Sequence, residues 1–205
     1  MGTITVNQTV GTVMLAHQAV THPDTVKQSA TSVAGKIGAT ITMFHASVEA
    51  AANTNPGQFL VQTSASSSGD EDWATIANFA ATISTADTEA MTATEPIGET
   101  VLACASTTGF VANDILYIQD TGVVADGEWA RCQEIVTNTS INLIDGLTTQ
   151  KDSSDVIWND ADVFVCYVDC RSVARLRVVF QHEGATGANC HVKALMTTHD
   201  SWLTA

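Results

Sequence analysis

Basic residues are scarce in this sequence. It contains 8 Lys and Arg against 22 Asp and Glu, which gives a formal net charge of −14 at pH 7. Nucleic-acid binding depends on clustered Lys and Arg that neutralise phosphates, and anionic membrane surfaces attract the same residues. We therefore expect no nucleic-acid partner and no membrane partner.

Long hydrophobic runs are absent as well. No apolar stretch approaches the roughly 18–20 residues of a transmembrane helix. The first residues lack the basic start and apolar core of a signal peptide. Met1-Gly2 begins like a myristoylation motif, but Val6 occupies the position that requires Ser or Thr. These features predict a protein made in the cytoplasm.

The sequence has few cysteines, and their spacing matches no known framework. Their number is odd and no CxxC pair occurs, which favours reduced thiols. Cys166 and Cys170 would share one face of a strand about 13 Å apart, too far for a disulfide. The five cysteines are Cys104, Cys132, Cys166, Cys170 and Cys190.

Motifs for catalysis, phosphate binding or metal binding are also missing. The sequence has no Gly-x-Ser-x-Gly and no P-loop. His182, Cys190 and His191 lack zinc spacing, and strand alternation would put the last two on opposite faces. Residues 70–72 are acidic but lack the ligand spacing of a calcium loop. We expect a non-enzymatic protein with no catalytic residues, no metal and no cofactor.

What remains is a composition that favours strands. Only 3 residues are Pro and 15% are charged, while 45% are hydrophobic, and Thr, Ser, Ala and Val are abundant. Period-two alternation is clearest from Ile37 to Phe44. Outside the insert described next, the predicted strands are 37–44, 59–63, 73–79, 163–168, 175–181 and 190–196.

Residues 97–160 have the pattern of a small β module inserted into a larger one. Five short strands in about 60 residues bury little core, and closure into a barrel would remove their exposed edges. Residues 84–94 are polar and are predicted to connect to this insert. The predicted strands of the insert are 100–104, 113–119, 128–136, 140–144 and 155–158.

The predicted architecture is all-β and has three parts. Residues 1–35 are expected to form an extended N-terminal arm. Residues 36–96 together with 161–205 supply the six or seven strands of a β-sandwich, jelly-roll or immunoglobulin-like. Residues 97–160 form the inserted small β-barrel.

Two runs of sequence stand out, with three shorter segments between them. The runs are residues 62–73 and residues 172–180 continuing to 191–194, and the segments between them are 114–118, 128–129 and 141–147. Together they resemble structural proteins of tailed-bacteriophage virions, and capsid decoration or cement proteins in particular. The resemblance covers roughly residues 30–200, and its motifs concern the fold rather than catalysis.

This resemblance implies a virion protein that binds and stabilises the outer capsid. Its expected location is the outer capsid surface, after synthesis in the host cytoplasm, because packaged DNA would repel its acidic charge. The implied partners are the major capsid protein or another virion protein, and copies of itself in a homo-oligomer, for which a trimer is one option. A tail, neck or baseplate component is an alternative. A glycan-binding host-attachment module is another, in which the four tryptophans would line a sugar site.

Arg175, Arg177 and Lys193 are the candidate protein-interface residues. The two arginines alternate with Leu176 and Val178 and should therefore share the outer face of a strand. Lys193 would join them if its strand is the neighbour. These cations could pair with carboxylates of a partner. A solvated sheet face that only reduces the net charge is the alternative.

Overall fold

The protein is all-β, with antiparallel strand pairing throughout its sheets. The computed structural model describes residues 4–21, 23–49, 56–70, 72–82, 87–182 and 189–203, with side chains from residue 11 to residue 200. Within these residues the strands form three sheets, and the only helix is a 3-10 turn at Val124–Asp126. No helix in this part of the chain could cross a membrane.

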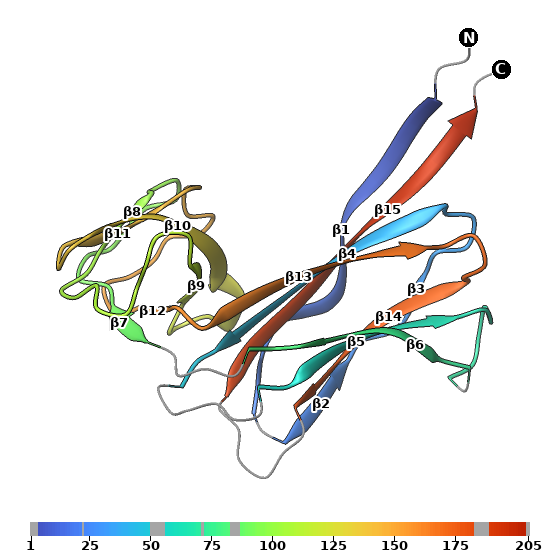
Figure 1. Ribbon diagram of the computed structural model, residues 1–205, viewed down its shortest axis with the longest axis horizontal. Helices are drawn as coiled ribbons and strands as arrows, with labels where there is room; N and C mark the ends of the chain where they lie inside the picture. Colours follow the sequence, from blue (N-terminus) through green and yellow to red (C-terminus); the bar gives the residue numbers. More distant parts are fainter. Residues whose placement is uncertain are drawn as a thin grey trace.

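Sheet I contains four long strands in the order β1-β15-β4-β13. Its central strand β15 pairs with β1 on one side and with β4 on the other. Past the end of β4 at Gly38, β1 and β15 continue as a two-stranded ribbon in which Ile4 pairs with Leu203 (Figure 1). The strands are β1 (Ile4–Val20), β15 (Cys190–Leu203), β4 (Gly38–Ser47) and β13 (Ala161–Asp169).

Sheet II faces sheet I and has β14 and β5 at its centre. The order is β2-β14-β5-β6, and the short strand β3 also pairs with β14. The strands are β2 (Asp24–Lys27), β3 (Thr31–Ser32), β5 (Gln58–Ser64), β6 (Ala74–Ala80) and β14 (Arg175–His182).

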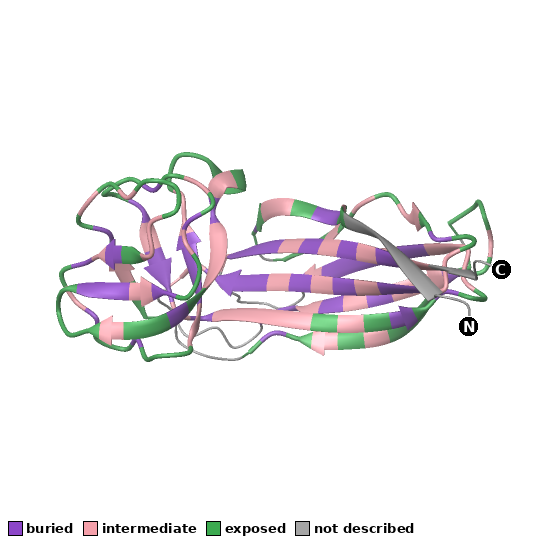
Figure 2. Cartoon of the chain, turned by 90° about the horizontal axis from the view of Figure 1, so that it is seen from above, coloured by how far each residue is buried: buried purple, intermediate pink, exposed green. Residues whose placement is uncertain are grey.

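The main hydrophobic core lies between sheets I and II. Side chains at every second position point inward, so buried residues alternate with more exposed ones along the strands (Figure 2). Ile41 and Met43 of β4 meet Val178 and Phe180 of β14 in one cluster of fully buried residues. This alternation confirms the strands predicted at 37–44 and 175–181.

The described part of residues 1–35 belongs to the sheets and is not a separate arm. It contributes β1, β2 and β3, and Met14, Leu15, Val20 and Val33 are buried in the main core. The expectation failed because three register shifts interrupt the pairing of β1 with β15, and each shift breaks the alternation that would mark a strand.

Sheet III is formed entirely by residues 88–158, and we call this segment the six-stranded unit. Its order is β7-β12-β9-β10-β11-β8. It has its own core, which includes Leu102, Leu116, Ile118 and Ile141. The strands are β7 (Thr88–Ala90), β8 (Val101–Ala103), β9 (Ile115–Gln119), β10 (Glu128–Val136), β11 (Ser140–Leu143) and β12 (Val156–Trp158).

The two end strands of the unit, β7 and β8, approach each other. Met91 forms an isolated bridge with Cys104, and the Thr92 amide donates a hydrogen bond to the Ala103 carbonyl at 2.9 Å. β7 lies in the segment 84–94 that was predicted to be a connection, so the unit begins ahead of residue 97. β7 was not predicted because a strand of three residues is too short to show alternation.

The two ends of the six-stranded unit lie close together, beside one end of the two facing sheets (Figure 1). The Asp87 amide donates a hydrogen bond to the Asn159 side-chain oxygen at 2.8 Å, and the Asn159 amide donates one to the Asp87 carbonyl at 3.2 Å. The Trp129 indole donates a further hydrogen bond to the His45 carbonyl at 3.0 Å. The unit therefore contacts the outer face of sheet I at one end.

Candidate functional site

The structure brings two of the three predicted interface residues together. Arg175 and Arg177 lie on the outer face of β14, because Leu176 and Val178 occupy its core face. Lys193 lies on β15 in sheet I, so it does not share their surface. The prediction that all three form one face is wrong for Lys193, since β14 and β15 belong to different sheets. Contact with a partner stays a prediction for each residue.

Arg175 holds the loop that joins β5 to β6. Its guanidinium donates hydrogen bonds to the carbonyl oxygens of Ser66 at 2.7 Å, Ser68 at 3.1 Å and Gly69 at 2.7 Å. These bonds stabilise the loop conformation together with those that the Ser64 and Ser66 hydroxyls make to the loop backbone. The Arg175 side chain is thus held in one position by contacts within the fold.

Arg177 is bound just as closely. It donates hydrogen bonds to the Gln62 side-chain oxygen and to an Asp70 carboxylate oxygen, both at 2.7 Å, and its side chain is only 14% exposed. Asp70 also accepts a hydrogen bond from the Trp73 indole at 3.0 Å and lies 3.7 Å from the Lys27 ammonium. The Trp73 hydrogen bond, the Lys27 charge and the Arg177 hydrogen bond lower the pKa of Asp70.

Trp73 completes what we call the Trp73 cluster: Lys27, Asp70, Trp73, Arg175 and Arg177. The guanidinium carbons of Arg175 and Arg177 lie 4.9 and 4.1 Å from the centroid of the indole ring, within cation–π distance. The cluster lines an open cavity of about 540 Å³ together with residues 28–30 and 69. Its three cations against one carboxylate suit it to bind an anionic group.

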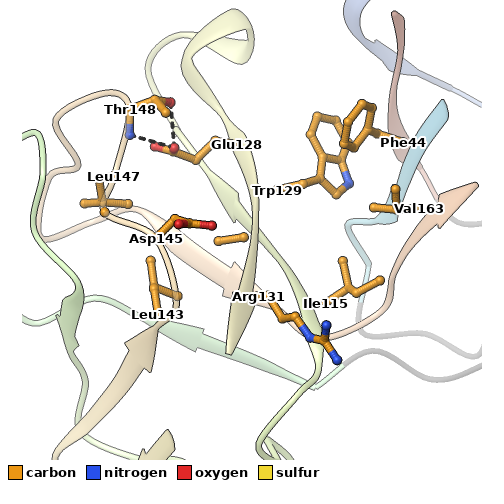
Figure 3. A pocket seen from close by; sticks show the side chains of 12 residues that line it. Phe44, Ile115, Glu128, Trp129, Arg131, Leu143, Asp145, Leu147, Thr148 and Val163 are labelled. Carbon is orange, nitrogen blue, oxygen red and sulfur yellow. Dashed lines mark hydrogen bonds between the residues drawn. The ribbon is translucent and has the colours of Figure 1, made fainter. Parts of the chain in front are cut away.

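A second cavity, the junction cleft, lies between the six-stranded unit and the outer face of sheet I (Figure 3). Its volume is about 460 Å³. The Phe44 and Trp129 rings approach to 5.4 Å between centroids and form part of an apolar wall. The lining residues are Phe44, Ile115, Glu128, Trp129, Ala130, Arg131, Leu143, Asp145, Gly146, Leu147, Thr148 and Val163.

The carboxylate of Glu128 at this cleft is engaged in structural contacts. Thr148 donates to it from its amide at 2.8 Å and from its hydroxyl at 2.6 Å (Figure 3). The fully buried Lys151 ammonium lies 3.2 Å away and also donates to the Asp126 carbonyl. Burial alone would raise the pKa of Glu128, but the hydrogen bonds from Thr148 and the Lys151 charge lower it. Glu128 is therefore held ionised as half of a buried ion pair.

A chain of three polar rings joins the unit to sheet I beside the cleft. The Tyr117 hydroxyl of β9 lies 2.5 Å from His191 Nδ1 of β15 and 3.0 Å from His17 Nε2 of β1. Burial lowers the pKa of His191 to about 4, and the charge of His17 acts in the same direction. Burial also lowers the pKa of His17 and raises that of Tyr117. The three groups are neutral near pH 7 and serve as a structural hydrogen-bond chain.

The described residues contain no group of three or more His, Cys, Asp or Glu side chains placed to bind a metal ion. Cys190 is buried in the main core, whereas His191 faces the six-stranded unit, as alternation predicted. All five cysteines are free thiols, and burial raises the pKa of Cys190 above its ordinary value.

No protein-family model matches the sequence, and no curated protein matches it significantly. The assignment of a function therefore depends on the surfaces described above. Sequence reasoning found the two arginines through their alternation on β14. It missed Trp73, Lys151 and the Tyr117 chain, because their partners lie far away in the sequence.

Proposed function

We propose that this chain is a non-enzymatic structural protein of a tailed-bacteriophage virion that binds and stabilises the outer capsid. The resemblance of residues 30–200 to decoration proteins supports this proposal, as does the acidic charge of −14. The mechanism is mass action: a protein that binds only the assembled shell shifts the equilibrium towards it. Binding of this kind needs no catalytic residue, metal or cofactor.

The proposal includes a more detailed description of the fold. Sheets I and II then form a β-sandwich of the jelly-roll or immunoglobulin-like type, and the six-stranded unit is a small inserted barrel. The shared core of the two sheets supports the first part. The Met91–Cys104 bridge between the end strands of the unit supports the second.

The observation that carries the proposal is the concentration of positive charge in the Trp73 cluster. Lys27, Arg175 and Arg177 are three of only eight basic residues in the chain, and they line one cavity. Two of them pack against an indole, a side chain common at protein interfaces. An acidic surface on the major capsid protein or on another virion protein is the partner that this cluster fits.

Co-sedimentation with capsids that lack the protein tests this proposal. Lys27 is the most suitable residue to change, because its side chain is 55% exposed and its reversal leaves both arginines in place. We expect Lys27→Glu to weaken capsid binding about tenfold at about 50 mM salt and less at about 500 mM, because screening weakens charge pairs. Arg131→Glu makes the same charge change on an exposed residue of β10 and should bind normally.

Two results would contradict the proposal. The first is wild-type protein that does not sediment with capsids at low salt. The second is an equal loss of binding for the Lys27 and Arg131 variants, which would indicate a general charge effect. Mass spectrometry of purified capsids and tails from the same particles separates a decoration protein from a tail, neck or baseplate component.

A further inference from the structure

One edge of sheet I is unprotected against pairing with another strand. β13 forms this edge and pairs with β4 over all nine residues without a register shift. No strand among the described residues pairs with its other side. Its backbone groups on that side are therefore available as a template for a further strand.

The other edges of sheets I and II carry features that hinder such pairing. β1 has three register shifts, and the pairing of β6 with β5 has one. β2 has four residues and ends at the half-exposed Lys27. Bulges, short strands and edge lysines are the usual protections of natural sheets. β13 has none of them: it contains no Lys, Arg or Pro, and Val165 and Tyr167 are 61% and 63% exposed.

We propose that β13 pairs antiparallel with β13 of a second copy, around a twofold axis at Val165. In this register Val165 faces Val165, and Val163 faces Tyr167. The only charged residues of the strand stand near its ends, so Asp162 faces Val168 and Asp169 faces Ala161. No aspartate faces another, and the centre of the contact is apolar.

The two aspartates are also compensated within their own copy. Asp162 accepts hydrogen bonds from the Thr82 amide at 2.8 Å and the Thr82 hydroxyl at 2.7 Å. Asp169 forms an ion pair with Arg171. Both carboxylates therefore have hydrogen-bonding partners within their own copy, and Asp169 also has a cation beside it.

A second copy fits this edge because the strand is complementary to itself. The pairing would join the four strands of sheet I in each copy into one continuous sheet, a closed twofold arrangement. The exposed Val165 lies beside Thr42 and Leu195 in the sheet, so the apolar row would run across both copies. The contact uses neither the Trp73 cluster nor a capsid, so it holds or fails independently of the proposed function.

Sedimentation velocity and hydrogen–deuterium exchange of the full chain test this pairing at about 1 and about 100 µM. We expect a dimer at the higher concentration and slower amide exchange in residues 161–169. Val165→Lys would place two lysines directly opposite each other and should weaken dimerisation at least about tenfold. Val13→Lys is the matched control, because Val13 is 50% exposed on the opposite edge strand of sheet I; it should dimerise normally.

Three results would overturn the proposal. They are a wild-type monomer at about 100 µM, a dimer without added protection in residues 161–169, and an equal response of the two lysine variants. Circular dichroism shows whether Val165→Lys is folded. If it is not, Tyr167→Lys replaces it, and the exchange of the wild-type protein still decides the location of the contact.

Discussion

At the scale of residues, the polar side chains of this protein are held by partners from distant parts of the chain. Arg177 binds Asp70, and Tyr117 lies between two histidines. A buried polar group without a partner costs free energy, so each of these contacts protects the fold where it lies. These groups therefore determine how stability responds to pH and to substitution.

The histidines of the Tyr117 chain predict a loss of stability in mild acid. The pKa of His191 is lowered to about 4 by burial and by the charge of His17, whereas the unfolded chain has the ordinary value near 6.5. The contribution of neutral His191 to the free energy of unfolding is complete above about pH 6.5. It is lost as the pH falls towards 4, because the unfolded chain then binds more protons than the folded chain. We expect the free energy of unfolding to fall by about 2 kcal/mol between about pH 7.5 and pH 5, measured by urea denaturation.

Substitution of His191 provides the control for this pH effect. His191→Gln keeps a polar group near the Tyr117 hydroxyl but cannot titrate, so its stability should depend less on pH in this range. The wild-type protein, measured under the same conditions, is the reference for this comparison. If the free energy of unfolding of the His191 variant falls with pH as steeply as that of the wild-type protein, other groups cause the loss.

The buried ion pair of the six-stranded unit predicts a strongly non-additive pair of substitutions. Lys151 is fully buried and its ammonium lies 3.2 Å from Glu128. Lys151→Met should reduce stability by about 3–5 kcal/mol, because it leaves a poorly solvated carboxylate without its cation. Glu128→Gln added to Lys151→Met should recover most of this loss. Urea denaturation of the single and double variants measures the coupling, and additive losses would contradict it.

At the scale of elements, alternation predicted the strands that have one buried face. β4 and β14 were found close to their observed bounds for this reason. β1 was missed although it is the longest strand, because its register shifts move buried positions out of phase. Period-two patterns thus predict regular strands well and bulged strands poorly.

Sheet membership of a strand could not be predicted from local pattern. The two arginines of β14 were placed together correctly, since residues two apart on a strand share a face. Lys193 was misplaced because the partners of β15 are β1 and β4, which are far from it in the sequence. Trp73 was missed as a partner of the arginines for the same reason. A binding surface formed by several strands requires the topology, which the sequence pattern does not contain.

At the scale of the whole molecule, the six-stranded unit joins the facing sheets through one small junction, where Ala46 of sheet I packs against Tyr117 and Trp158 of the unit. The chain crosses between them at Asp87 and Asn159, whose backbones and side chains are hydrogen-bonded to each other. Tyr117, Trp129 and the Ala125 carbonyl provide further polar contacts across the junction. Each part also has its own hydrophobic core. This arrangement predicts that the two parts fold separately.

Replacement of residues 88–158 by a short Gly-Ser linker tests this separation. Because Asp87 and Asn159 already lie side by side, the linker closes a short gap at little entropic cost. We expect sheets I and II to keep their strand content and to unfold in one cooperative transition, measured by circular dichroism during urea denaturation. The wild-type protein is the reference, and a broad transition or a random-coil spectrum of the linker variant would contradict the prediction.

The pairing of β1 with β15 also determines the order in which the chain can fold during its synthesis. β1 leaves the ribosome well before its partner in sheet I, which consists of residues 190–203. The six-stranded unit is contiguous in sequence, so all of its strands are made long before that partner exists. The unit can therefore fold while β1 and β4 still lack their common partner strand. Sheet I can form only after β15 has been synthesised.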